Sequence, residues 1–189
     1  MHEIFKSYLT GQIKLTNEQW QLVFRLWKPT VTKRGEVLLQ KGKVSHNTYF
    51  VVKGCLGIFL SGDDGHEYTR FLVFEGKFGS AFPSFTTRKP SAASILSIEA
   101  SQILLLNYRD HQYLLDHIPG WERLFRINLE KEYIYSIQRI ESLISMDAKR
   151  RYEILLEQNP KLIQRLPSKI VAGYLGISQE TLSRLKSKK

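Results

Sequence analysis

The chain has 189 residues, a formal net charge of +10 and 42% hydrophobic residues, so it can bury a core of ordinary size. Its single cysteine, Cys55, excludes an internal disulfide framework and a cysteine-based metal cluster. No run approaches 18 apolar residues and the N-terminus has no secretory leader pattern, so we expect a cytoplasmic protein without a membrane partner.

The basic excess is concentrated toward the C-terminus. Residues 146–189 contain ten Lys or Arg against four Asp or Glu, a net charge of +6, whereas the first 145 residues carry +4. A basic module attracts polyanions and gains free energy from counterion release. The charge distribution therefore favours a nucleic-acid partner, with a merely solvated basic surface as the alternative.

A short amphipathic helix is predicted near the N-terminus. Four apolar residues follow the i, i+3, i+4, i+7 spacing of one helix face: Trp20, Val23, Phe24 and Trp27. Thr16 stands three residues before Gln19, the spacing of a capping box. Pro29 is expected to end this helix.

Residues 35–108 change to short β-rich runs separated by glycine. The runs are GEVLLQKG, NTYFVVKG, CLGIFLSG, HEYTRFLVFEG and ASQILLLN, with glycines at positions 35, 42, 54, 65 and 76. Asp63-Asp64-Gly65 is typical of a tight hairpin, because glycine accepts a positive φ. Short strands at this spacing predict an antiparallel sandwich or barrel, and no pattern of helix length interrupts them.

From Trp121 the period becomes helical for about 25 residues. Six residues form a stripe along this helix: Phe125, Leu129, Tyr133, Ile137, Ile140 and Ile144. Since a small β domain cannot cover so long a stripe, we expect part of it to pair with a second copy in a homodimer. The run MDAKRRYEILLEQNP then predicts another helix, which ends at Asn159-Pro160.

Two short helices follow, on either side of Gly176. Six residues are expected to face inward: Ile170, Val171, Tyr174, Leu175, Leu182 and Leu185. Gly176 suits a left-handed turn and Ser178 is a good N-cap. Five polar residues are left facing outward: Gln179, Glu180, Ser183, Arg184 and Lys186. This arrangement predicts a helix-turn-helix that presents its second helix.

The order of elements resembles the Crp/Fnr family of bacterial transcription regulators over nearly the whole chain. RGEVLLQKGKVSHNTYFVVKGCLGIFLSGDDGHEYTRFLVFEGKFG is similar, glycine by glycine, to the cyclic-nucleotide-binding β-roll of that family. SKIVAGYLGISQETLSRLKSKK is similar to its helix-turn-helix. The resemblance implies a regulator that binds double-stranded DNA as a homodimer, with RNA polymerase as a further partner.

The polar residues of the last helix have the chemistry for reading DNA. Arg184 can donate twice to guanine, Glu180 can accept from cytosine and Gln179 can pair with adenine; the resemblance places base contacts at these three positions. Five residues are better placed for phosphates: Ser168, Lys169, Ser178, Thr181 and Lys186. The alternative is that Glu180 and Arg184 form only an i, i+4 ion pair on a solvated helix.

Many family members continue into a β-wing, whereas this sequence ends at Lys189. We therefore expect the backbone contacts of a wing to be missing, with Lys186, Lys188 and Lys189 substituting for part of them. A dimer that reads two half-sites becomes more necessary as a result. Whether the missing wing abolishes specific binding is left open.

The resemblance also locates an effector pocket, at Phe78, Gly79, Ser80, Phe82, Ser91 and Ala92. Nucleotide-binding relatives carry Gly-Glu-Leu for the ribose and Arg-(Ser/Ala)-Ala for the phosphate. Here Ser80 replaces the glutamate and Ser91 replaces the arginine, so a charge-assisted contact is lost unless Arg88 or Lys89 supplies it. We expect cyclic AMP and cyclic GMP to bind weakly or not at all. Two alternatives are left open: the pocket accepts a different, less charged ligand, or it is filled by its own side chains.

The sequence gives little support for a metalloprotein, a haem protein or an enzyme. One cysteine excludes the iron–sulfur cluster of Fnr-like members, and the scattered histidines offer no evident haem pocket, although haem is left open. A cupin-type metal enzyme would need a His-x-His motif, which the sequence lacks. Neither a Ser-His-Asp order nor a glycine-rich phosphate loop is present, so we expect no metal, no cofactor and no enzymatic activity.

These observations predict an α+β protein. An antiparallel, jelly-roll-like β-roll flanked by helices would occupy residues 1–120, a long dimerisation helix residues 121–145, and a helix-turn-helix domain residues 146–189. The predicted function is transcription regulation with a degenerate effector pocket. The alternative is a ligand-binding or protein-interaction module without sequence-specific DNA binding.

Overall fold

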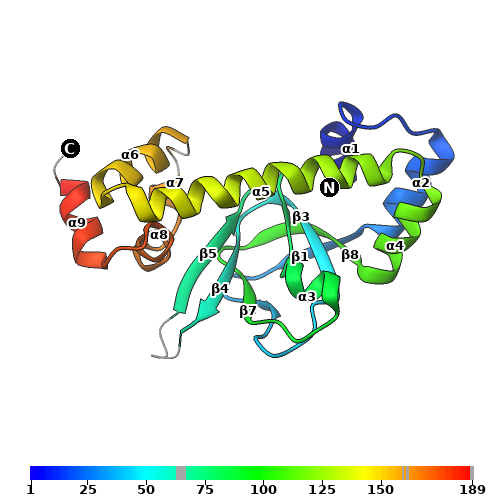
Figure 1. The fold of residues 1–189 in the computed structure, drawn as a ribbon. Helices are drawn as coiled ribbons and strands as arrows, with labels where there is room; N and C mark the ends of the chain where they lie inside the picture. Colours follow the sequence, from blue (N-terminus) through cyan, green and yellow to red (C-terminus); the bar gives the residue numbers. More distant parts are fainter. Residues whose placement is uncertain (63–66, 159, 161, 188–189) are drawn as a thin grey trace.

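The computed structural model describes residues 1–62, 67–158, 160 and 162–187. Figure 1 shows a β-roll with one long helix lying across it and shorter helices gathered at both ends of that helix. This mixed architecture of helices and antiparallel sheets confirms the predicted fold class. The sequence predictions made for Asp63-Asp64-Gly65, Asn159, Lys188 and Lys189 fall outside the described residues.

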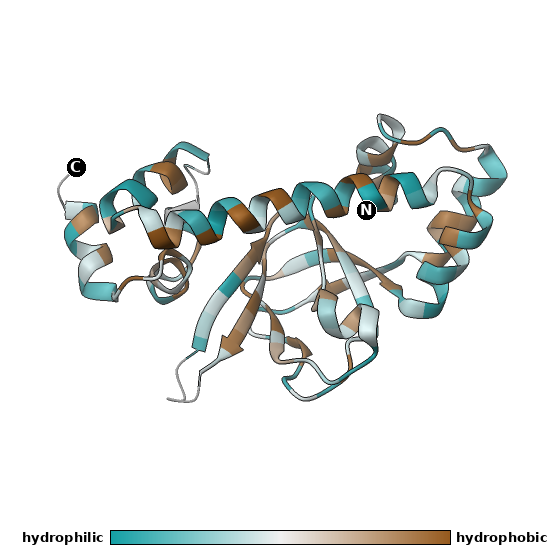
Figure 2. Cartoon of the chain, in the orientation of Figure 1, coloured by the Kyte–Doolittle hydropathy of each residue, from teal (hydrophilic) through white to brown (hydrophobic). Residues whose placement is uncertain are grey.

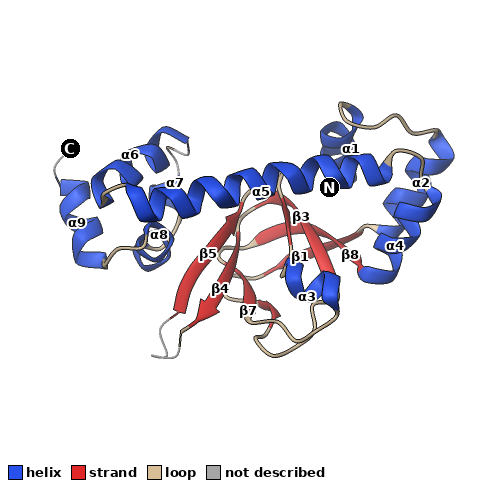
Figure 3. Cartoon of the chain, in the orientation of Figure 1, coloured by secondary structure: helices blue, strands red, loops and turns tan. Residues whose placement is uncertain are grey.

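The roll consists of two antiparallel sheets, drawn red in Figure 3. One sheet has the order β1 (Lys28–Thr32), β8 (Ser101–Asn107), β3 (Asn47–Lys53), β6 (Phe78–Gly79). The other has the order β2 (Val37–Leu39), β7 (Ala93–Ser97), β4 (Leu56–Ser61), β5 (Glu67–Val73). Each of the five predicted β-rich runs contains one of these strands, while β1, β6 and β7 were not predicted.

The glycines between strands adopt the conformation expected of them. Gly35, Gly42, Gly54 and Gly76 all have positive φ, which side chains with a Cβ rarely tolerate. At Gly54, with φ of 107°, an added Cβ would also lie 2.2 Å from Ser101 Oγ. The spacing of glycines in the sequence therefore reports real chain reversals in the roll.

Three helices cover one end of the roll: α1 (His2–Thr10), α2 (Asn17–Leu26) and α4 (Tyr108–His117). The capping box of Thr16 and Gln19 at the start of α2 is confirmed. The predicted role of Pro29 is wrong, because α2 ends at Leu26 and Pro29 lies within β1. Since β1 is an edge strand, a residue without an N–H is tolerated there. Helices α1 and α4 were not predicted.

The long helix is α5 (Trp121–Ser145), and it has the predicted bounds. It runs across the roll from the N-terminal helices to the C-terminal ones (Figure 1), and apolar and polar segments alternate along it (Figure 2). A short helix, α3 (Phe82–Thr87), interrupts the strands of the roll, contrary to the prediction that none would. Pro83 at its start favours the helical φ.

The C-terminal helices are α6 (Ala148–Gln158), α7 (Leu162–Arg165), α8 (Ser168–Leu175) and α9 (Gln179–Ser187). They share an apolar core with the roll rather than standing apart from it. A second core joins α1, α2 and α4 to β3 and β8, and a third fills the inside of the roll. Within the described part of the chain, three apolar clusters thus hold the elements together.

Candidate functional site: a helix-turn-helix and an internal cavity

Helices α8 and α9 form the predicted helix-turn-helix. Gly176 closes α8 in the left-handed conformation, with φ of 65° and ψ of 40°. Ser178 caps α9, because its Oγ accepts a hydrogen bond from Thr181 N at 3.2 Å. Leu182 is buried on the inner face of α9 and packs in the same cluster as Val171 and Leu175. These contacts set which face of α9 is turned outward.

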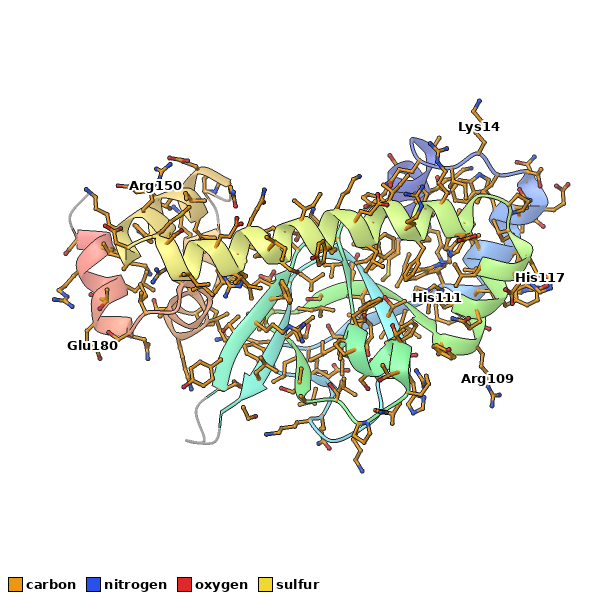
Figure 4. The ribbon with its side chains drawn as sticks, in the orientation of Figure 1. Lys14, Arg109, His111, His117, Arg150 and Glu180 are labelled. Atoms are coloured by element: carbon orange, nitrogen blue, oxygen red, sulfur yellow. The ribbon has the colours of Figure 1, made fainter. Side chains whose placement is uncertain are left out.

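The outward face of α9 carries polar side chains, and Figure 4 shows Glu180 at the tip of the module. Gln179, Glu180, Ser183 and Arg184 are exposed. Arg184 Nη2 donates to Thr181 Oγ1 at 3.2 Å. A hydrogen bond from Ser178 is the main cause that lowers the pKa of Glu180, and the charge of Arg184 adds a smaller effect. Glu180 is therefore ionised at neutral pH and can act as a hydrogen-bond acceptor.

The residues predicted for phosphate contacts lie beside this face. Ser168 and Lys169 are exposed at the start of α8, and Lys186 Nζ donates to Ser168 Oγ at 3.1 Å. Thr181 is half-buried and Ser178 is exposed. The start of α8 and the end of α9 thus meet, which brings the amine of Lys186 to the hydroxyl of Ser168, next to Lys169 in the chain.

A cavity of about 780 Å³ lies between the roll and the face of α5 that is turned toward it. Aromatic side chains from four parts of the chain contribute to its wall: Trp27, Phe71, Phe78, Phe82, Phe125 and Tyr135. Charged side chains also border it: Arg70, Glu75, Lys77, Lys131 and Glu132. Burial raises the pKa of Glu132, with the Lys77 charge opposing the shift. Its size suits a small organic molecule.

The structure divides the predicted effector residues into two groups. Phe78, Gly79, Ser80 and Phe82 line the cavity, whereas Ser91 and Ala92 do not. Ser91 is buried, and its hydroxyl donates to Ala93 O at 2.8 Å and accepts from Ala93 N at 3.0 Å. The hydroxyl that stands in place of the expected arginine is therefore engaged by the backbone of its own segment.

The guanidinium of Arg88 makes its contacts outside the cavity. Its Nη1 donates to Ser45 O at 2.7 Å and to Phe85 O at 3.0 Å, and its guanidinium lies 4.3 Å from the ring centre of Tyr108. Arg88 does not line the cavity, and neither does Lys89. Neither of these two cations substitutes for the missing arginine in this arrangement.

His111 of α4 is a cavity residue that the sequence analysis missed. Its ring is 4% exposed, stacks on Phe85 at 5.4 Å and meets the edge of Phe125 at 4.7 Å. Its Nδ1 has no hydrogen-bond partner among the described residues. Burial lowers the pKa of His111, so the imidazole is neutral at pH 7. Only the packing of α4 against α3 and α5 brings this ring to the cavity.

The predicted dimer stripe on α5 is mostly exposed. The exposed residues are Leu129, Tyr133, Ile137, Ile140 and Ile144, and their exposed fractions run from 37% at Ile137 to 81% at Ile144. Leu129 and Tyr133 also border the cavity. Phe125 differs, because it is half-buried and packs against Phe82 and His111 of its own chain. The structure adds Ile134 and Leu143 to the exposed apolar residues of this helix.

Neither a metal-binding cluster nor a membrane-spanning helix occurs in the described ranges. No cluster of three or more His, Cys, Asp and Glu side chains there could hold a metal ion. Among the same residues, none of the helices combines the length and apolar character needed to cross a membrane.

Residues 29–117 match the family model of the cyclic nucleotide-binding domain. No curated protein matches the chain in sequence. Among solved structures, the chain is similar to CLP, a c-di-GMP responsive global regulator from Xanthomonas campestris, with 16% identity, a TM-score of 0.73 and coverage of 92% of this chain and 91% of that one. It is similar to a CooA mutant from Carboxydothermus hydrogenoformans, with 19% identity, a TM-score of 0.70 and coverage of 94% and 86%. A third similar structure, from Eubacterium rectale, is described as a Crp/Fnr-family transcriptional regulator (16% identity, TM-score 0.70, coverage of 95% and 85%).

Proposed function

We propose that the protein is a homodimeric, sequence-specific DNA-binding regulator, because residues 29–117 match the family model of the cyclic nucleotide-binding domain and the chain has the fold of Crp/Fnr transcription regulators. Its roll would bind an effector other than a cyclic nucleotide. The protein would act by binding alone, without catalysis. RNA polymerase is the further partner that such a role implies.

The observation that carries this proposal is the outward face of α9. Leu182 is buried against the rest of the module, so Gln179, Glu180 and Arg184 are turned to solvent together. These side chains can recognise adenine, cytosine and guanine edges in a major groove. Ser168, Lys169 and Lys186 lie at the neighbouring edge, where phosphate contacts would set the register.

A homodimer is supported by the exposed apolar face of α5. Seven large apolar side chains of this helix are exposed: Leu129, Tyr133, Ile134, Ile137, Ile140, Leu143 and Ile144. A contiguous apolar surface of this kind is rarely left in water by a soluble protein. Pairing of two α5 helices would cover it and would set two recognition helices at a distance suited to two half-sites.

The nature of the effector is supported by the cavity. Ser80 borders it in place of the glutamate of nucleotide-binding relatives, and neither Arg88 nor Lys89 reaches it. Three other cations border the cavity, Arg70, Lys77 and Lys131, but none of them stands at the sequence position of the relatives' arginine. A phosphate would therefore lack the partner that nucleotide-binding relatives provide at that position. The aromatic wall favours a largely apolar molecule. Calorimetry with cyclic AMP and cyclic GMP is expected to show weak binding or none.

The decisive experiment is a selection of bound sequences from a pool of random duplex DNA. The wild-type protein is expected to enrich a site with two related half-sites, and Arg184→Ala is expected to relax the preference at one base pair of each, a loss of about 1–3 kcal/mol in discrimination. Arg109→Ala is the matched control, since Arg109 projects from α4 at the far end of the molecule from Glu180 (Figure 4).

The rival hypothesis predicts a different result. A ligand-binding or protein-interaction module with basic helices would bind DNA in a salt-dependent way but without sequence preference. In that case no site would be enriched, and Arg184→Ala would change no base preference.

A further inference from the structure

The cavity is elongated along α5. Residues of this helix line it from Trp121 to Ser136. At a rise of about 1.5 Å per residue, this stretch of helix is about 22 Å long. A cavity of about 780 Å³ that follows the helix over such a length suits an extended molecule better than a compact one.

The two ends of the cavity differ in chemistry. The residues of α5 that line it from Trp121 to Leu129 carry no charge, whereas Lys131 and Glu132, further along the helix, are charged. Four aromatic residues of the uncharged end also line the cavity: Trp27, Phe78, Phe82 and Phe125. The cavity is therefore apolar toward the start of α5 and charged further along the helix.

The charged end has more cations than carboxylates to balance them. Glu75 is already paired with Arg165, so Glu132 is the carboxylate left among the described lining residues. Three lining cations take part in none of the ion pairs between described residues: Arg70, Lys77 and Lys131. The Lys77 charge acts on Glu132, so these two groups belong to the same end. A single negative charge on a ligand is therefore attracted to this end.

Two ring nitrogens of residues that line the cavity have no partner in the described part of the chain. They are Trp27 Nε1 and His111 Nδ1, and the two residues are 2% and 4% exposed. The indole nitrogen can only donate, whereas a neutral imidazole nitrogen donates or accepts according to its tautomer. Since buried polar groups nearly always have a partner, a neutral oxygen on the ligand is the group that fits here.

The separation between the two polar features sets the length of the ligand. The His111 ring meets Phe125 with ring centres 4.7 Å apart, and Phe125 stands six residues before Lys131 on α5. Six residues of helix correspond to about 9 Å. A ten-carbon chain, about 11 Å long when extended, is long enough to join the two ends.

We propose that the cavity binds a long-chain monocarboxylic acid that carries a neutral oxygen, as a hydroxyl or ketone group, near the far end of its chain. The carboxylate lies at Lys77 and Lys131, the methylene groups lie against the aromatic rings, and the far oxygen bonds to His111 Nδ1. This inference rests on the proposed function only for calling the molecule an effector, because its binding is measured without DNA.

The first test is calorimetry of the full chain with three molecules that share a ten-carbon chain: decanoate, 1-decanol and decyltrimethylammonium. Decanoate is expected to bind about tenfold more tightly than the other two, because it alone brings a negative charge to the unpaired cations. No saturable binding of decanoate, or binding no tighter than that of 1-decanol, would overturn the proposal.

Lysine variants test where the carboxylate lies. Lys77→Met and Lys131→Met keep the apolar stem and remove the charge, so each is expected to weaken decanoate about tenfold and to leave 1-decanol unchanged. Lys14→Met is the matched control, since Lys14 is exposed, lies outside the cavity and projects from the segment between α1 and α2 (Figure 4). If both cavity variants bind decanoate as the control does, the carboxylate site is wrong.

The far oxygen is tested with 10-hydroxydecanoate. A hydroxyl that is buried without a partner weakens binding about fivefold or more. The wild type is therefore expected to bind 10-hydroxydecanoate at least as tightly as decanoate, whereas His111→Phe is expected to bind it about fivefold or more weakly than decanoate. His117→Phe is the control, because His117 lies at the exposed end of the same helix (Figure 4).

Decanoate itself reports whether the His111→Phe site is intact, since its affinity is expected to be nearly unchanged. An equal hydroxyl penalty in the wild type and in His111→Phe would refute the role of His111. Failure of the DNA selection with these affinities as expected would contradict the proposed function alone, and the reverse result would contradict the ligand class alone.

Discussion

The guanidinium of Arg139 lies 4.0 Å from the ring centre of Tyr174 while its Nη2 donates to the carbonyl oxygen of the same residue at 2.7 Å. Arg139 is the one place on α5 where, among the described residues, a side chain donates to both the roll and the helix-turn-helix. A planar guanidinium with several fixed donors can satisfy three carbonyls at once, which a lysine ammonium does less well.

Arg139→Ala is expected to destabilise the protein by about 2 kcal/mol, because three partly buried carbonyl oxygens lose a charged donor. Arg139→Lys is expected to recover only part of the loss. Urea unfolding at fixed protein concentration measures both. A loss no larger than that of Arg123→Ala, an exposed arginine at the start of α5, would show that the contact adds no stability.

Gly176→Ala is expected to destabilise the helix-turn-helix by about 1–2 kcal/mol, because Gly176 has φ of 65° and an alanine there is strained. An added Cβ would also lie 3.0 Å from Leu143 Cδ2. Gly11→Ala is the matched control: Gly11 has φ of −76° and open space around it, so this change is expected to be neutral or slightly stabilising. In thermal unfolding, the Tm of Gly176→Ala is expected to fall below that of the wild type, whereas the Tm of Gly11→Ala is expected to stay the same or rise slightly.

Ile144→Asp is expected to weaken the proposed dimer about 100-fold or more, since each of two copies would bring a carboxylate into an apolar interface. Ile144 is 81% exposed in the single chain, so the monomer fold should be unaffected. Sedimentation equilibrium checks the result. Val31→Asp is the control, because Val31 is also exposed and apolar but lies on β1 of the roll. A wild-type protein that stays monomeric at all concentrations would contradict the dimer.

The ion bridge from Arg165 to Glu75 and Glu99 should make the free energy of unfolding depend on pH. Burial alone would raise the pKa of Glu75, but hydrogen bonds from Arg165 and from Gly54 N outweigh it, so the pKa is lowered below its ordinary value of 4.5. A lowered pKa in the folded state means that the contribution is present above pH 4.5 and is lost as pH falls through the folded pKa.

The measurement for the bridge is the unfolding free energy of the wild type and Glu75→Gln from about pH 7 to about pH 3. The difference between them is expected to shrink toward the acid end, because the wild-type carboxyl becomes neutral there. A difference that stays constant over this range would mean that the effect of Glu75→Gln does not arise from the charge of the carboxylate.

Much of the local structure follows from short-range pattern. The glycines at 35, 42, 54 and 76 predicted the chain reversals because glycine tolerates the positive φ that such turns need. The capping box at Thr16, the bounds of α5 and the turn at Gly176 also followed from patterns that span neighbouring residues. Helices α1 and α4 were not predicted, although each buries two residues at helical spacing: Phe5 and Leu9 in α1, and His111 and Leu114 in α4.

The sequence by itself determined the order of elements and the outward polar face of α9, because helix period, capping and glycine conformation act over a few neighbouring residues. Only the tertiary structure decided which residues from different segments of the chain meet and which of them line the cavity. His111 meets Phe125, Arg165 joins Glu75 and Glu99, and Ser91 stays outside the cavity. Apart from the His111–Phe125 contact, these relationships join or separate segments tens of residues apart in the chain. They depend on how α4, α5 and α8 pack on the roll, and no local pattern records that packing.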